Sequence, residues 1–172
     1  SAQAQDRVRS AGLVFGAKRL LAGLPADCTA QRFALYKPEE ILDTLAQHPG
    51  QDAAVLYSGD TGFYSGASGL LTPLRALGIP ARVYPGVSSI QLLSAALGRP
   101  WQDWKLASAH GCSCDPVGLC MTHKAVFFLT GGAETPASLC RRLSDAGLGN
   151  AHATVGENLG TETEAIRYGS AE

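Results

Sequence analysis

Apolar and polar positions follow one another from Gly12 to Gly98 in a pattern that predicts strands and helices in turn. Short apolar runs indicate strands, and apolar residues spaced three or four apart indicate helices with one buried face. Strands are expected at Arg32–Leu35, Ala53–Tyr57 and Ala81–Tyr84. Helices are expected at Ala2–Ala11, from Pro38 to Pro49, around Leu70–Leu77 and from Ser88 to Leu97. This alternation predicts an α/β protein with a parallel sheet.

The helix around Leu70–Leu77 contains Pro73. Proline lacks a backbone donor and its ring clashes with the preceding turn of a helix. The helix therefore either kinks at Pro73 or begins at Thr72, and the sequence leaves both open.

The segment Trp101-Gln102-Asp103-Trp104 interrupts the alternation. We expect a domain boundary there, with an N-terminal α/β domain over residues 1–100 and a second, mixed α/β domain over residues 101–172. In the second domain we expect strands at Lys105–Ala109, Ala125–Leu129 and His152–Val155, and a helix capped by Thr135 that runs through Leu143 and ends at Gly147.

The loop Ser58–Gly66 directly follows the apolar strand Ala53–Tyr57 and is the most informative stretch of the chain. It combines small residues with one acid and two aromatic residues, so its backbone can approach a ligand closely. Such loops at the carboxyl ends of parallel strands are typical ligand sites. Asp60 either contacts a ligand or caps the turn, and Phe63 and Tyr64 either line a ligand or fill the core.

Three further positions are candidates for a site. Ser88 precedes a predicted helix and is expected to cap it, and amides at such a cap can also serve a ligand. Thr130-Gly131-Gly132 ends a predicted strand, and Glu157 lies in a predicted turn, where it is either an ordinary exposed acid or a proton acceptor.

Composition excludes several classes of function. With 172 residues, 45% hydrophobic and 17% charged, the chain can form a well-packed core. A formal net charge of −1 leaves no cationic surplus for nucleic acid, and no apolar run approaches the ~20 residues that span a bilayer. We expect a cytoplasmic protein with no nucleic-acid or membrane partner.

Five cysteines in a chain of this size favour free thiols over a disulfide framework. Three of them lie with two histidines in one stretch, His110, Cys112, Cys114, Cys120 and His123. These are zinc-ligand types, but the Cys-x-Cys spacing suits a tetrahedral structural site poorly. We expect no bound metal and a mobile loop.

Several of these stretches, in this order, resemble the tetrapyrrole (corrin/porphyrin) methylase family, and within it the precorrin C5-methyltransferase branch of cobalamin biosynthesis. The segments similar to family motifs are Ala11–Leu20, Gly59–Ser65, Pro85–Ser89, Trp101–Trp104, Thr130–Gly132 and Glu157–Glu162. Thr61 stands where the family usually has proline. The family's Gly-x-Gly-Pro-Gly loop has no counterpart, and we expect residues 1–172 to lack the first strand with this loop and the last strands of the second domain.

The resemblance implies a two-domain fold with a cleft for S-adenosyl-L-methionine between the domains, and C5 methylation of a precorrin or cobalt-precorrin by a homodimer. It implies as candidate cofactor-binding residues Asp60, Phe63, Ser88, Ser89, Thr130 and Gly131, and as candidate catalytic residues Tyr64 and Glu157. Open alternatives are methylation of another ring position, a diphthamide or ribosomal RNA methylase of the same architecture, and a non-catalytic cofactor-binding or dimer-forming subunit.

Overall fold

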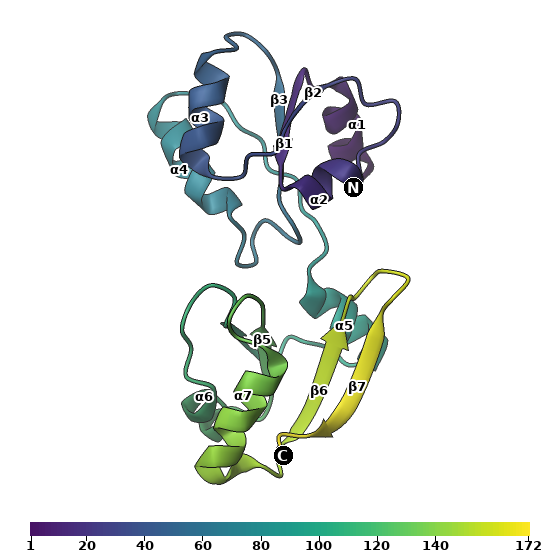
Figure 1. Ribbon diagram of the computed structural model, residues 1–172, viewed down its shortest axis with the longest axis vertical. Helices are drawn as coiled ribbons and strands as arrows, with labels where there is room; N and C mark the ends of the chain where they lie inside the picture. The colour runs from purple at the N-terminus through teal and green to yellow at the C-terminus, as the bar shows by residue number, and fades with distance from the viewer. The chain divides into compact units, whose positions relative to one another are not determined.

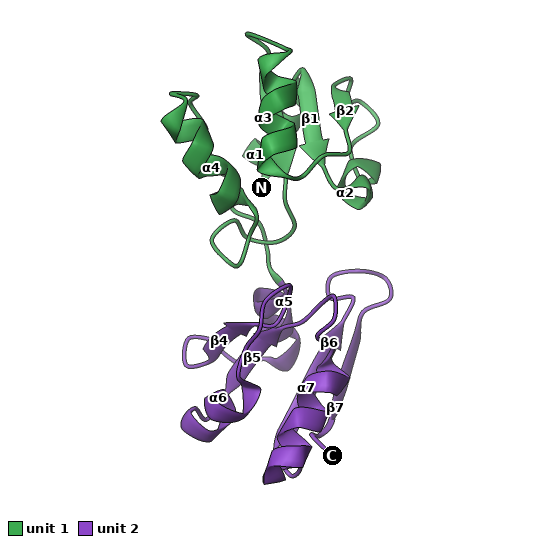
Figure 2. Cartoon of the chain, turned by 60° about the vertical axis from the view of Figure 1, so that its left-hand side comes forward, with its two compact units in different colours: residues 1–88 green, residues 89–172 purple.

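The computed structural model describes residues 1–172 and divides into two compact units, residues 1–88 and residues 89–172 (Figures 1 and 2). The first unit holds a parallel three-stranded sheet in the order β2-β1-β3. Its strands are β1 (Leu13–Gly16), β2 (Gln31–Phe33) and β3 (Ala53–Leu56). Its helices are α1 (Ala2–Ser10), α2 (Lys18–Ala22), α3 (Pro38–Ala46) and α4 (Ala67–Ala76). The predicted parallel α/β arrangement is confirmed.

The central strand β1 is buried on both faces because its side chains alternate between two hydrophobic clusters. Val14 packs with Leu21 and Cys28 in one cluster. Leu13 and Phe15 pack in the other cluster, together with Ile41 from α3 and with Leu70 and Leu74 from α4. Figure 1 shows α1 and α2 on one side of this sheet and α3 and α4 on the other. Covering both faces leaves the carboxyl edge of the sheet for loops.

Helix α4 begins before the proline and contains it. Ala67 is its first residue and Pro73 lies inside, so the alternative start at Thr72 is wrong. The hydroxyl of Ser65 accepts a hydrogen bond from the Ala67 amide at 3.2 Å, and Leu70 is buried in the core. These contacts in the first turn hold the helix together ahead of Pro73.

Residues 81–84 were expected to form a strand, and this prediction was wrong. They form no ladder with any strand of the sheet, and β3 is an edge strand. The Arg82 guanidinium instead lies over the Tyr84 ring, 5.1 Å from its centroid. An apolar run becomes a strand only where a neighbouring strand pairs with its backbone groups.

The second unit contains two pairs of strands. The pair β4 (Lys105–Ser108) and β5 (Val126–Leu129) is parallel, and the pair β6 (His152–Glu157) and β7 (Ala165–Ser170) is antiparallel, which confirms the predicted mixed architecture. The helical segments are α5 (Ser89–Leu97), α6 (Pro116–Thr122), α7 (Pro136–Leu143) and the π-helical turn η1 (Ser144–Leu148). No helix in the chain has the length and apolar character needed to cross a membrane.

Local sequence signals set the ends of α7. The Thr135 hydroxyl accepts from the Ser138 amide at 3.1 Å, and the Ser138 hydroxyl accepts from the Thr135 amide at 3.0 Å, which forms a reciprocal capping box. Gly147, with φ of 80°, ends the helical run. Both ends agree with the predicted helix.

The chain divides between Ser88 and Ser89, ahead of α5, so α5 belongs to the second compact unit. Side chains of α5 pack there: Leu93 lies against Gly156 in β6, and Leu92 lies against Gly160 in the turn after β6. The domain boundary expected between residues 100 and 101 stays a prediction.

Candidate functional site

In the first unit, the candidate site is the loop that leaves β3. Strands β1 and β3 are parallel and in register from Leu13 with Ala53 to Gly16 with Leu56, so their carboxyl ends lie side by side. The Arg19 guanidinium, after β1, donates a hydrogen bond to the Ser58 hydroxyl, after β3, at 2.7 Å. The sequence pattern marks the segment Ala11–Leu20 but gives no signal for this contact of Arg19.

Asp60 stabilises the turn of this loop. Its Oδ1 accepts a hydrogen bond from the Gly62 amide at 2.7 Å, which is the expected turn contact. Its Oδ2 accepts no hydrogen bond from the protein. Asp60 therefore stabilises the turn, and one of its carboxylate oxygens remains for a ligand. Its role in cofactor binding stays a prediction.

The two informative loops of the first unit contact each other through Gly59, Asp60, Gly86 and Ser88. Ser88 is only 5% exposed, and its hydroxyl accepts a hydrogen bond from the Asp60 amide at 2.7 Å. Gly59 has φ of +75°, and a Cβ on Gly86 would collide with the Gly59 carbonyl. The structure thus brings together Asp60 and Ser88, two of the predicted cofactor-binding residues.

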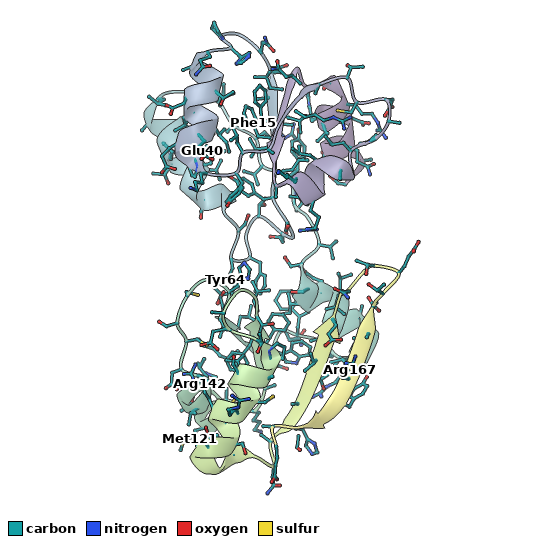
Figure 3. The ribbon with its side chains drawn as sticks, viewed as in Figure 1. Phe15, Glu40, Tyr64, Met121, Arg142 and Arg167 are labelled. Carbon is teal, nitrogen blue, oxygen red and sulfur yellow. The ribbon has the colours of Figure 1, made fainter.

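Phe63 and Tyr64 form an edge-to-face pair with ring centroids 4.9 Å apart. Tyr64 is 54% exposed, so the alternative that it fills the core is wrong (Figure 3). Its φ of 47° is unusual for a residue with a side chain and costs conformational energy. Strain of this kind is concentrated at functional sites, which keeps Tyr64 a candidate.

Tyr57 lies at the base of the same loop, with its ring against Gly66. Its hydroxyl is buried and has no hydrogen-bond partner. Burial raises the pKa of the Tyr57 phenol, because the charged form loses solvation. An unpaired buried hydroxyl lowers the stability of the folded state, and the sequence carried no signal for it.

In the second unit, the carboxyl ends of the parallel strands β4 and β5 bring His110 and Gly131 together. The imidazole of His110 occupies the space that a side chain on Gly131 would need. The Gly131 amide donates to the Glu134 carbonyl at 2.9 Å, so this amide is already used within the turn. The space beside Gly131 is therefore taken by His110, and Thr130 next to it is half-buried. The cofactor roles of Thr130 and Gly131 stay predictions.

Ser89 and Glu157 are also in the second unit. Ser89 is the first residue of α5 and is half-buried. Glu157 is the last residue of β6, and its carboxylate lies 3.2 Å from the guanidinium of Arg167. Figure 3 labels Arg167 on β7. Both side chains are largely exposed, so this ion pair contributes little to stability. The proposed roles of Ser89 and Glu157 stay predictions.

The cysteine-containing loop is tied to α7. Arg142 donates to the Cys114 carbonyl at 3.0 Å and forms an ion pair with Glu134 at 3.5 Å. Burial raises the pKa of the Cys114 thiol, although Arg142 opposes the shift, and burial also raises the pKa of the Cys120 thiol. No three His, Cys, Asp or Glu side chains are grouped so that they could hold a metal ion. The mobility expected of this loop stays a prediction.

Comparisons with known proteins agree with this architecture. The chain is 33% identical over 168 residues to the cobalt-precorrin-7 C(5)-methyltransferase of Salmonella typhimurium, which covers 96% of this chain and 81% of that protein. The precorrin-6Y methylase structure from Archaeoglobus fulgidus superposes with a TM-score of 0.69 at 21% identity, covering 99% of this chain and 82% of that one. The uroporphyrin-III C-methyltransferase of Thermus thermophilus, solved with S-adenosylhomocysteine, gives a TM-score of 0.74 at 18% identity, covering 99% and 77%.

The family model described as Tetrapyrrole (Corrin/Porphyrin) Methylases matches residues 1–172. The match therefore includes both compact units and every candidate loop described above. The chain belongs to the tetrapyrrole (corrin/porphyrin) methylase family.

Proposed function

We propose that this chain is an S-adenosyl-L-methionine-dependent methyltransferase of cobalamin biosynthesis that methylates C5 of a precorrin or cobalt-precorrin macrocycle. The observation that carries the proposal is the 33% identity over 96% of the chain to a cobalt-precorrin-7 C(5)-methyltransferase. The solved relatives are below 25% identical and support the fold alone.

The residues at the strand ends fit this cofactor. In the first unit, the unused Oδ2 of Asp60 suits an ammonium group or a ribose hydroxyl. The exposed ring of Tyr64 and the neighbouring Phe63 suit a flat base or a cation. In the second unit, the missing side chain of Gly131 lets the His110 imidazole pack against the loop at the carboxyl end of β5.

Bound S-adenosyl-L-methionine supplies an activated sulfonium methyl group, which an electron-rich ring carbon can attack directly. The protein's part is then mainly to orient the two reactants and to exclude water. Asp60, Phe63, Ser88, Ser89, Thr130 and Gly131 would hold the cofactor. Tyr64 and Glu157 would act at the macrocycle, with Glu157 leaving Arg167 to accept a proton.

Homodimer formation and a cytoplasmic location, both expected from the sequence, are part of this proposal. Light scattering of the purified full-length protein would measure the oligomeric state, and a monomeric mass at micromolar concentration would contradict the dimer.

The decisive experiment uses the full-length protein, S-adenosylhomocysteine and cobalt-precorrin-7. Calorimetry should show binding of S-adenosylhomocysteine, and ¹³C-methyl-labelled S-adenosyl-L-methionine should place one labelled methyl at C5, as read by NMR. Methylation at another ring carbon would reassign the substrate position. Binding without any methyl transfer would favour the non-catalytic alternative, and no binding at millimolar ligand would end the enzyme proposal.

A further inference from the structure

We propose that Arg19 forms a carboxylate-binding subsite at the carboxyl edge of the first unit's sheet, with Ser58 positioning its guanidinium. This inference rests on the proposed function. The carboxylate would belong to one of the two reactants.

The backbone places Arg19 and Ser58 together. Gly16 and Leu56 are register partners at the ends of β1 and β3. A Cβ on Gly16 would lie 3.1 Å from the Leu56 Cβ and 3.2 Å from its carbonyl oxygen, so the two strand ends pack closely because Gly16 has no side chain. Helix α2 begins at Lys18, two residues after β1 ends, and the candidate loop begins at Ser58, two residues after β3 ends.

The hydrogen bond between Arg19 and Ser58 joins residues 39 positions apart in the sequence, at 2.7 Å. A long arginine side chain at an exposed position ordinarily samples several rotamers. A short hydrogen bond to a neighbouring loop restricts that freedom and aims the guanidinium across the carboxyl edge of the sheet. Arg19 is thereby held ready for a ligand before the ligand arrives.

The charge of Arg19 is not neutralised within the protein. Three of the other nine arginines have carboxylate partners: Arg9 pairs with Asp6 and Asp27, Arg142 with Glu134, and Arg167 with Glu157, at 3.2–3.5 Å. Arg19 is exposed, and its bonded partner is a neutral hydroxyl. A guanidinium has five donors, so most of them remain for a planar anion, which carboxylate matches in a bidentate manner.

Both reactants of the proposed methyl transfer carry such a group. The methionine part of the cofactor ends in a carboxylate, and a corrin precursor carries acetate and propionate side chains. The subsite chemistry is the same for both sources, and binding experiments can separate them.

Arg19→Gln removes the charge and keeps a good helix former in α2. The matched control is Lys18→Gln, because Lys18 is the adjacent exposed cation and makes no side-chain hydrogen bond. Calorimetry of the full-length proteins would use S-adenosylhomocysteine and 5′-methylthioadenosine, which lacks the amino-acid carboxylate. Steady-state kinetics would use cobalt-precorrin-7.

If the cofactor's carboxylate binds Arg19, Arg19→Gln should lower the affinity for S-adenosylhomocysteine by about tenfold or more. The affinity for 5′-methylthioadenosine should stay the same. If a macrocycle carboxylate binds Arg19, the affinity for S-adenosylhomocysteine should not change. The KM for cobalt-precorrin-7 should instead rise about tenfold at constant kcat. Arg19→Lys should recover part of either loss, and Ser58→Ala should give a smaller change in the same direction. Each of these two patterns supports the subsite.

Two results would overturn the subsite and leave the proposed function standing. One is that Arg19→Gln gives wild-type values in all three measurements, and the other is that it lowers the affinity for both nucleoside ligands equally. A wild-type protein that neither binds S-adenosylhomocysteine nor transfers a methyl group would overturn the proposed function together with the inference that rests on it.

Discussion

Replacing Gly86 with alanine tests the contact between the two loops of the first unit. The φ of Gly86 lies outside the left-handed region, so its backbone can accept alanine without conformational strain. The new Cβ would nevertheless lie 3.0 Å from the Gly59 carbonyl carbon, nearer still to its oxygen, and 3.6 Å from the Asp60 amide nitrogen. The cost of Gly86→Ala therefore comes from this contact alone.

Relief of the collision requires backbone movement. Carbon atoms pack best at about 3.5–4.0 Å, so the two loops must separate by roughly 1 Å. Overpacking of this kind costs about 1–3 kcal/mol, and each kcal/mol lowers the melting temperature of a chain of this length by about 2–4 °C. Moving the Gly59–Asp60 backbone would also stretch its hydrogen bond to Ser88, now 2.7 Å. We expect a loss of about 2–12 °C and at least about tenfold weaker binding of S-adenosylhomocysteine.

Gly69→Ala is the matched control in the same unit. Gly69 is inside α4, and the nearest atom to its new Cβ would be the Pro38 Cγ at an ordinary 3.6 Å. Alanine is favoured over glycine in a helix by about 1 kcal/mol, so Gly69→Ala should raise the melting temperature. Thermal unfolding followed by circular dichroism would measure both variants. A Gly86→Ala protein that melts at or above the wild-type temperature and binds S-adenosylhomocysteine normally would refute the close contact between the loops.

Three other changes have expected outcomes. Tyr57→Phe should leave stability at pH 7 unchanged or raise it by about 1 kcal/mol, because the lost hydroxyl is buried without a partner. Since burial raises the folded-state pKa of Tyr57, the wild type should lose stability relative to this variant as pH rises above about 10. Urea unfolding at pH 7 and 10.5 would measure both effects. A Tyr57→Phe protein less stable than the wild type at pH 7 would contradict the expected gain. Asp60→Asn should keep the Gly62 contact and the melting temperature but lower the affinity for S-adenosylhomocysteine about tenfold. Unchanged affinity in calorimetry would make Asp60 a turn residue only. A chelator should not change the melting temperature, because no three ligand side chains are grouped; stoichiometric zinc whose removal lowers the melting temperature would contradict this.

The sequence by itself determined the elements whose signals are local. The apolar runs that predicted β3, β4 and β5 are short and bounded by turn residues, and each is a strand at nearly the expected residues. The cap at Thr135 and the proline at the start of α3 also act within one helical turn. The position of the candidate loop at the end of β3 follows from the same local pattern.

Tertiary structure decided what depends on neighbours. Residues 81–84 have a strand-like pattern but no partner strand, and β7 was missed although it pairs with β6 along its whole length. Backbone pairing is supplied by another segment, so an apolar run alone does not specify it.

The contacts within each unit's candidate loops were also decided by the tertiary structure. Arg19 meets Ser58 across 39 positions, and Asp60 meets Ser88 across 28. His110 meets Gly131 because β4 and β5 are parallel neighbours. Sequence patterns mark each residue as a candidate, but which residues meet is set by the order and direction of the strands, since parallel strands bring their carboxyl ends to one edge.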